Sequence, residues 1–151
     1  MKNGRAHQST PIAFYRWAND RYRFDLDACA DDWNAKCGRF ISPEQDSLRP
    51  ELRWTGRVWL NPPWSRILPW VEKARAEVFD HGSAELVVAL LPGRVGSEAH
   101  IEILERWADP IAIRGRIKFG APPGEETGAG GFEDCRLWVF ERPLVASRFN
   151  Q

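Results

Sequence analysis

Val58-Trp59-Leu60-Asn61-Pro62-Pro63-Trp64 joins a short apolar run to two consecutive prolines and an aromatic ring. The apolar residues at 58–60 predict a buried strand, which must end at the prolines because proline has no backbone N–H for a strand ladder. Asn61 precedes a proline and is therefore held in an extended conformation. Since two fixed φ angles follow, the stretch predicts a rigid turn at the carboxyl end of a strand, where open α/β sheets bind ligands.

This turn offers two hydrogen-bond acceptors to a planar amino group. Asn61 contributes its side-chain carbonyl, and Pro62 contributes its backbone carbonyl. Pro63 stiffens the turn, and Trp64 presents a ring against which a planar group can stack. Two acceptors that hold both amino hydrogens draw the nitrogen lone pair out of conjugation and make the nitrogen more nucleophilic. The alternative is a rigid strand-to-loop turn followed by a tryptophan of the hydrophobic core.

Apolar periodicity and proline or glycine breaks divide the remaining chain into alternating helices and strands. We expect helices at 10–19, 67–79 and 98–107, the first with Thr10 as N-cap and Pro11 as first helical residue. We expect strands at 24–30, 39–41, 57–60, 86–91, 111–113, 116–119 and 136–140. In the last helix, the spacing of Ile101, Leu104 and Trp107 predicts that all three side chains point inward.

This alternation indicates a doubly wound α/β sheet. We expect one domain at residues 10–142, between a flexible N-terminus at 1–9 and a C-terminal tail at 143–151. The length of 151 residues, of which 43% are hydrophobic, suits one domain with its own core.

Charge and cysteine usage limit the classes of function. Acidic and basic residues are equal in number, 21 each, so no net field draws the chain to nucleic acid. Three cysteines without C-x-x-C spacing and three scattered histidines argue against disulfides and against a metal site. Neither a membrane-spanning apolar run nor a signal peptide is seen, so we expect a cytoplasmic protein.

Two acidic residues follow predicted strands and are candidates for ligand contacts. Asp27 lies near the carboxyl end of the strand at 24–30, where a carboxylate can hold a ligand's ammonium group. The small residues Ala28, Cys29 and Ala30 then let the ligand approach the backbone. Asp46 lies in the polar, irregular segment 42–53. Either aspartate has an alternative role as a turn-forming residue, and Asp46 also as a helix cap.

Taken together, these pieces resemble one known family. They are Thr10-Pro11, the segment 24–30, Asn34, Asp46, Asn61-Pro62-Pro63-Trp64, Leu90-Leu91-Pro92 and the segment 115–119. In order and spacing they resemble the short phage-type (Dam-like) DNA N-6-adenine methyltransferases, from Thr10 to about Phe140. The resemblance implies a minimal Rossmann-like methyltransferase fold, S-adenosylmethionine as methyl donor and the adenine amino group of double-stranded DNA as acceptor. It also implies a phage or prophage gene expressed in a bacterial cell.

The resemblance further assigns roles to single residues. Thr10 and Pro11 would lie near the donor's carboxylate, Asp27 near its amino group, and Asp46 against its adenine, while residues 61–64 would handle the target base. Two segments depart from the family pattern. Ala28-Cys29-Ala30 stands where larger methyltransferases have a glycine-rich donor loop, and residues 93–96 differ from the polar stretch expected after Pro92.

Local positive charge supplies candidate DNA contacts, namely Arg66, Arg94, Arg114, Arg116 and Lys118. The glycine-rich segment 120–131 is expected to stay unpacked without DNA and to close over it on binding. Such contacts would mostly reach phosphates, which predicts weak sequence discrimination and strong salt dependence. The alternative for 120–131 is an ordinary surface loop between two strands.

Two other functions remain open from the sequence alone. One is methylation of a different planar amino group, either in cytosine or in a protein glutamine. The other is a catalytically silent DNA-binding relative, against which the neutral net charge and the intact Asn-Pro-Pro-Trp turn argue.

Overall fold

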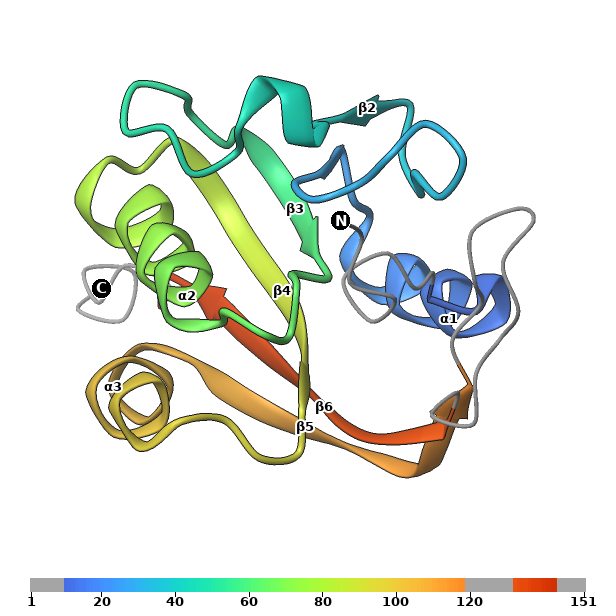
Figure 1. Ribbon diagram of the computed structural model, residues 1–151. Coiled ribbons are helices and arrows are strands. Elements are labelled where there is room, and N and C mark those ends of the chain that lie inside the picture. The colour runs from blue at the N-terminus through green and yellow to red at the C-terminus, as the bar shows by residue number, and fades with distance from the viewer. Residues whose placement is uncertain (1–9, 119–131, 144–151) are drawn as a thin grey trace, which may run out of the picture.

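The computed structural model describes residues 10–118 and 132–143, which form a six-stranded sheet with helices on both faces (Figure 1). The strands are β1 (Leu26–Asp27), β2 (Arg39–Phe40), β3 (Gly56–Leu60), β4 (Ala84–Pro92), β5 (Asp109–Lys118) and β6 (Phe132–Glu141). The longer helices are α1 (Ile12–Tyr22) and α2 (Leu68–Arg75). A 3-10 turn, η2 (Pro43–Gln45), follows β2. The π-helical η3 (Ala76–Asp80) continues α2, and the π-helical η4 (Ala99–Leu104) leads into α3 (Glu105–Trp107).

The strand order is β2-β1-β3-β4-β6-β5. Strands β1 to β4 are parallel to one another, whereas β6 runs antiparallel between β4 and β5. From β1 the chain first builds β2 on one side and then returns to build β3 on the other, so the strand order reverses between β1 and β3. The predicted doubly wound α/β class is therefore confirmed, in a small Rossmann-like form whose ligand crevice is expected at this reversal.

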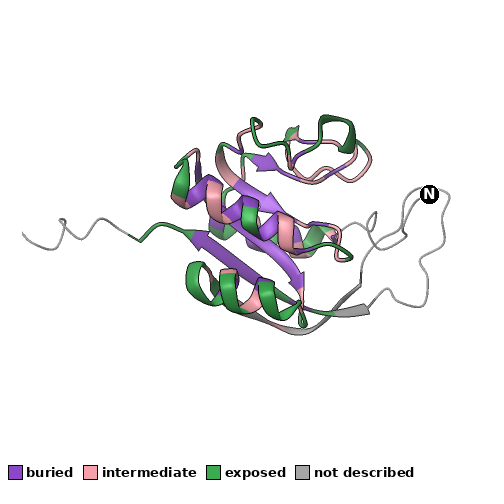
Figure 2. Cartoon of the chain, turned by 60° about the vertical axis from the view of Figure 1, so that its left-hand side comes forward, coloured by how far each residue is buried: buried purple, intermediate pink, exposed green. Residues whose placement is uncertain are grey.

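Different helices cover the two faces of the sheet, with α1 on one side and α2 and α3 on the other (Figure 1). Successive residues of β4 join opposite clusters: Leu86, Val88 and Leu90 pack on the α1 side, and Val87, Ala89 and Leu91 pack on the α2 side. Figure 2 shows the central strands buried and the outer helix surfaces exposed. Burial on both faces explains why the segment 86–91 is apolar throughout instead of alternating.

The ends of several elements differ from the prediction. The first helix extends to Tyr22, beyond the predicted end at residue 19. Thr10 does not cap it, because Pro11 holds the N-cap position and the Thr10 hydroxyl instead accepts a hydrogen bond from Asn61. The strands predicted at 111–113 and 116–119 form one strand, β5, because β6 pairs along its length and a register irregularity absorbs the interruption.

The predicted inward positions of Ile101 and Trp107 are wrong. Ile101 is 50% exposed and Trp107 is 38% exposed, whereas Leu104 is fully buried as predicted. For Ile101 the physical reason is the pitch of η4: its buried residues Ala99 and Leu104 are five positions apart, as the i→i+5 bonds of a π-helix require, so the face predicted from α-helical spacing rotates outward. Trp107 packs sideways instead, with its ring 5.0 Å from that of Phe79.

A buried carboxylate ties the segment before β3 to the helices on that face. Glu77 is 0% exposed, and its Oε1 accepts hydrogen bonds from the backbone N–H of Trp54 (2.6 Å) and the hydroxyl of Ser83 (3.0 Å). Its Oε2 pairs with Arg53 (3.3 Å) and with Lys73 (3.7 Å). Burial of a carboxylate is tolerated here because two cations and two hydrogen-bond donors surround it.

Lys73 extends this cluster toward the loop after β2. Its ammonium group donates to the backbone carbonyls of Arg49 (2.8 Å) and Leu52 (2.6 Å). The segment 49–54 is therefore held against α2, and with it the polar turn that contains Asp46 and Ser47.

We expect Glu77→Ala to lower the free energy of unfolding by about 3–5 kcal/mol, because it removes the carboxylate partner of the buried Lys73 and leaves the Trp54 backbone N–H without its acceptor. Urea denaturation measures this loss. The matched control is Glu102→Ala, which breaks the exposed pair with Arg106 (3.8 Å) at the same helical spacing and should change stability by about 0.5 kcal/mol or less. Equal losses in both variants would contradict a stabilising role for the buried cluster.

Candidate functional site

A cavity of about 260 Å³ opens at the carboxyl ends of β1, β2 and β3, where the strand order reverses. Its lining comes from α2, which contributes Trp70, and from the segments that follow the three strands. Cys29, Ala30, Asp31 and Asn34 follow β1, whereas Ile41, Ser42, Pro43, Asp46 and Ser47 follow β2, and Pro63 follows β3. The position agrees with the rule for ligand binding in open α/β sheets.

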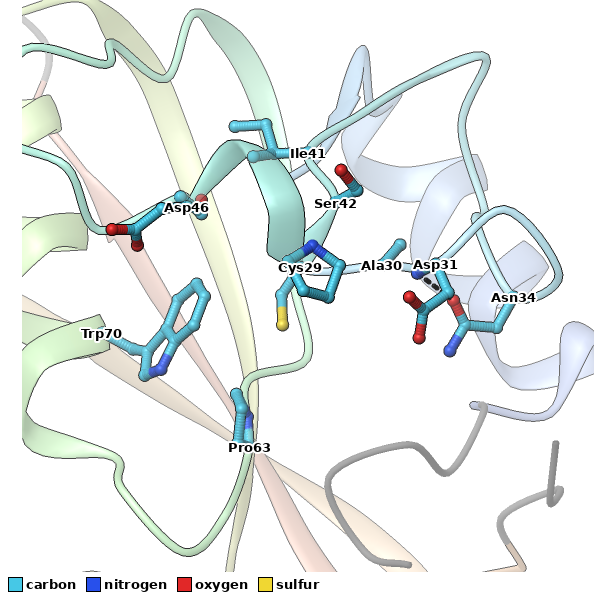
Figure 3. A pocket seen from close by; sticks show the side chains of 11 residues that line it. Cys29, Ala30, Asp31, Asn34, Ile41, Ser42, Asp46, Pro63 and Trp70 are labelled. Atoms are coloured by element: carbon cyan, nitrogen blue, oxygen red, sulfur yellow. Dashed lines mark hydrogen bonds between the residues drawn. The ribbon is translucent and has the colours of Figure 1, made fainter. Parts of the chain in front are cut away.

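Acidic side chains stand at opposite ends of the cavity, as Figure 3 shows. Asp46 lies on the side of Trp70, and Asp31 lies beside Asn34, with Cys29 between the two ends. The Asn34 side-chain carbonyl accepts a hydrogen bond from the backbone N–H of Asp31 (2.7 Å), which fixes the turn at that end. The cavity thus combines apolar walls with acceptor groups at both ends.

Asp27 lies behind the cavity wall and is only 2% exposed. Its carboxylate accepts hydrogen bonds from the backbone N–H of Cys29 (3.3 Å) and of Lys36 (3.0 Å). Burial raises the pKa of this carboxyl group to about 6, although both backbone donors oppose the rise. In this structure Asp27 therefore shapes the loop after β1, and that loop carries the residues that face the cavity.

Asn61 directly follows β3 and comes two residues before Pro63, which lines the cavity. Its side-chain Nδ2 donates a hydrogen bond to the hydroxyl of Thr10 (3.0 Å), 51 residues away in the sequence. Because the nitrogen end of the amide is engaged with Thr10, Oδ1 is the end available to accept a hydrogen bond from a bound group. Pro62, the next residue, is buried.

Trp64 is half-buried and belongs partly to the core. Its ring packs against both hydrophobic clusters of the sheet, and its indole N–H donates to the carbonyl of Leu90 near the end of β4 (3.3 Å). The structure therefore supports the core role of this tryptophan, and its role as a stacking surface for a planar group stays a prediction.

Four of the predicted site residues line the cavity, namely Cys29, Ala30, Asp46 and Pro63. Asp46 also forms a turn, since its φ is 53° and its Oδ1 accepts from the backbone N–H of Leu48 (3.3 Å). Ala28 is buried, and its backbone N–H pairs with the carbonyl of Trp59 (3.0 Å). Thr10 and Pro11 do not line the cavity, although Thr10 reaches its rim through Asn61.

The predicted DNA contacts are spread over several loops and strands. Arg66 and Arg94 are exposed, the first after the Asn-Pro-Pro-Trp turn and the second after β4. Arg114, Arg116 and Lys118 lie on β5, but their side chains fall outside the described residues, as does the segment 120–131. The roles of all these residues stay predictions.

The lining residues that sequence reasoning did not select include Asp31, Ser42, Ser47 and Trp70. The first three follow strand ends, so their positions carry the same signal that pointed to Asp27 and Asp46. Trp70 carries no such signal, because its apolar side chain on a helix looks like any other core residue.

The thiol of Cys29 lines the cavity but is not activated. Burial raises the pKa of the Cys29 thiol to about 12, so this cysteine stays protonated at neutral pH and is a poor nucleophile. Within residues 10–118 and 132–143, no three His, Cys, Asp or Glu side chains cluster as metal ligands would. The same part of the chain contains no helix with the length and apolar character needed to cross a membrane.

Comparisons with known proteins agree on one family. The family model for DNA N-6-adenine-methyltransferase (Dam) matches residues 1–150. A DNA N-6-adenine-methyltransferase of Haemophilus phage HP1 (strain HP1c1) is 35% identical over 125 residues, which cover 79% of this chain and 69% of that protein. A DNA N-6-adenine-methyltransferase of Escherichia phage T1 is 40% identical over 109 residues, which cover 70% of this chain and 43% of that protein.

We expect the stability contributed by Asp27 to depend on pH. Because burial raises its pKa from 3.8 to about 6, the folded protein keeps a proton that the unfolded chain releases in this range. Relative to Asp27→Asn, the wild-type protein should therefore lose about 3 kcal/mol of stability as pH rises through this window, and then stay level. Chemical denaturation of both proteins across the window measures this difference. Parallel pH profiles would show that the carboxyl group is not desolvated.

Trp64→Ala should lower the free energy of unfolding by about 2–3 kcal/mol, because the ring packs on both clusters while part of it stays exposed. Trp64→Phe should lose less, since most of the packing remains. The control is Trp17→Ala on α1, a ring that is 48% exposed and should contribute less. Thermal and urea unfolding of the three variants test this order, and a Trp64→Ala variant as stable as the wild type would mean that the ring is not part of the core.

Proposed function

The chain belongs to the DNA N-6-adenine-methyltransferase (Dam) family, which makes it a DNA adenine methyltransferase, and we propose that S-adenosylmethionine is its methyl donor and double-stranded DNA its substrate. The observation that carries the proposal is the position of the Asn61-Pro62-Pro63 turn, which stands at the rim of the cavity at the sheet's reversal point. A donor in the cavity and a base at the turn would be neighbours. We take residues 10–142 as the methyltransferase domain.

The cavity suits S-adenosylmethionine by the chemistry of its lining. Ile41, Pro63 and Trp70 offer apolar surface to a planar adenine ring, and acidic or amide side chains at each end offer acceptors to hydroxyl and ammonium groups. When bound, the donor supplies an electrophilic methyl group on a sulfonium centre. Among the protein's residues, Asp46 would hold the adenosine end.

At the other end of the cavity, Asp31 and Asn34 would hold the amino-acid end of the donor. Asp27 would support them from behind, through its hydrogen bonds to the backbone of the same loop. A carboxylate that already accepts two backbone hydrogen bonds and is almost fully buried contributes more by ordering this loop than by direct contact.

The chain's own residues prepare the acceptor nitrogen. A base in duplex DNA must first leave the stack, at a cost of a few kcal/mol. Stacking of the base on the half-buried ring of Trp64 would offset part of this cost. Asn61 Oδ1 and the Pro62 carbonyl would then each accept one hydrogen of the amino group. This fixes the nitrogen in position and polarises it, so catalysis consists mainly of orientation and electrostatic preorganisation.

DNA contacts would come from the basic side chains around this rim. Arg66 and Arg94 are exposed and follow the two strands nearest the target base, β3 and β4. Arg114, Arg116 and Lys118 are proposed from the sequence alone. Phosphate contacts of this kind predict affinity that falls as salt rises and little sequence discrimination.

Incubating the purified protein with unmethylated duplex DNA and methyl-labelled S-adenosylmethionine tests the function. Digestion of the DNA to nucleosides should give labelled 6-methyladenine. Labelled cytosine, or label transferred only to protein, would point to the other amino acceptors, and DNA binding without any label would point to a silent relative. The family match and the names of the relatives favour adenine.

Asn61→Ala should reduce the rate of methylation by about 100- to 1000-fold, because one of the two acceptors for the amino group is lost. Donor affinity, measured by calorimetry with S-adenosylmethionine, should persist, since Asn61 faces the base. Asn61→Asp keeps an acceptor oxygen and should retain more activity than the alanine variant. Turnover by Asn61→Ala at the wild-type rate would refute this mechanism.

A further inference from the structure

We propose that Thr10 is a positioning residue, whose hydroxyl sets the orientation of the Asn61 side-chain amide toward the target base. The inference rests on the proposed function, and it differs from the role that family resemblance suggests for Thr10, beside the donor's carboxylate. It begins from a single contact: the hydrogen bond from Asn61 Nδ2 to Thr10 Oγ1, 3.0 Å long.

Both residues of this contact are held by their backbones. Thr10 precedes Pro11, and Asn61 precedes Pro62, so each is restricted to extended conformations. Thr10 is also only 4% exposed, which keeps water from competing for its hydroxyl. The two side chains therefore meet on backbones that are already restricted. Formation of the hydrogen bond between them costs little conformational entropy.

A second contact joins α1, which begins two residues after Thr10, to β3, which ends just before Asn61. The Tyr15 ring of α1 meets the Trp59 ring of β3 edge-on, with centroids 5.4 Å apart. Trp59 lies just before the turn on β3, and Tyr15 lies in the first turn of α1, where its backbone N–H bonds to the carbonyl of Pro11 (3.1 Å). The start of α1 is thus fixed against β3 at two points, and the Thr10 hydroxyl is held at a constant place relative to Asn61.

The orientation of the Asn61 amide decides whether the turn can act. An amide has an acceptor end and a donor end, and only the acceptor end can hold a hydrogen of the target amino group. With Nδ2 bonded to Thr10, Oδ1 is the end of the amide left to accept a hydrogen of the target amino group. Without the hydroxyl, Nδ2 loses its partner, and the amide could rotate by a half-turn. Its N–H groups would then point at the hydrogens of the target amino group and repel them, and the amino nitrogen would not be polarised. Thr10 therefore acts through Asn61 and not on the donor.

Steady-state kinetics and donor calorimetry on Thr10→Val and Thr10→Ser test the proposal. Thr10→Val, which replaces the hydroxyl by a methyl group, should lower kcat by about 10- to 100-fold, with donor affinity unchanged. Thr10→Ser should restore most of the rate. Thr55→Val is the matched control, because Thr55 accepts a hydrogen bond from Arg39 (2.7 Å) just before the opposite end of β3, and it should leave kcat unchanged.

A weaker donor affinity in Thr10→Val with unchanged kcat would overturn the proposal in favour of a donor contact. Failure of serine to restore the rate would overturn it as well. In addition, Thr10→Val should have little effect on kcat when Asn61 is already alanine, because the two residues act as one unit. Independent losses in the double variant would contradict that coupling. Should the valine variant not fold, Thr10→Ala tests the same hydroxyl without an added methyl contact.

A spectroscopic readout separates this proposal from the proposed function. The Asn61 side-chain amide signals, identified by their loss in Asn61→Ala, should shift and exchange faster with solvent in Thr10→Val but not in Thr10→Ser. This measurement needs no turnover, so it tests the contact even in a protein that transfers no methyl group. Identical amide signals in wild type and Thr10→Val would overturn the inference, whereas absence of methylation with an intact contact would count against the proposed function alone.

Discussion

The pairing of β1 with β3 is the constraint on which the site depends. β1 has only two residues, yet it lies between β2 and β3 and is parallel to both. Its register aligns Asp27 with Trp59, and the backbone N–H of Ala28 then bonds to the Trp59 carbonyl (3.0 Å). This alignment brings the loop after Asp27 and the turn after Leu60 to the same edge of the sheet, so backbone pairing makes the cavity and the Asn-Pro-Pro turn neighbours.

What the sequence predicts well is local. The prolines after Leu60 and the apolar run at 86–91 identify β3 and β4, because proline chemistry and double-sided burial leave direct marks on the residues. The two prolines, which end β3, also locate the edge of the sheet where the cavity opens. By contrast, the helical spacing of Ile101 and Trp107 misleads, since a π-helical turn changes which side chains face inward and leaves no mark in the composition.

What the sequence cannot predict depends on contacts between distant segments. Thr10 and Asn61 are 51 residues apart, and nothing near Thr10 distinguishes a helix cap from a partner for a remote amide. Trp70 is similar, because only the packing of α2 against the sheet brings its ring to the cavity. Asp46 forms a turn and also lines the cavity, and the core contacts of Trp64 leave its ring half-buried, so the ligand roles of both residues stay predictions.

The absence of a glycine-rich loop after β1 has a consequence for how this chain can hold a donor. In the segment that replaces it, backbone groups are taken up by neighbouring strands: Ala28 N–H bonds to Trp59, and Ala30 N–H bonds to Ile41 (3.1 Å). The Cys29 N–H is likewise occupied, by the Asp27 carboxylate. The backbone N–H groups of residues 28–30 are therefore unavailable to a ligand. A donor in the proposed site would have to be held by the polar side chains that follow the strands, and the buried Asp27 would act on it only through the loop that it orders.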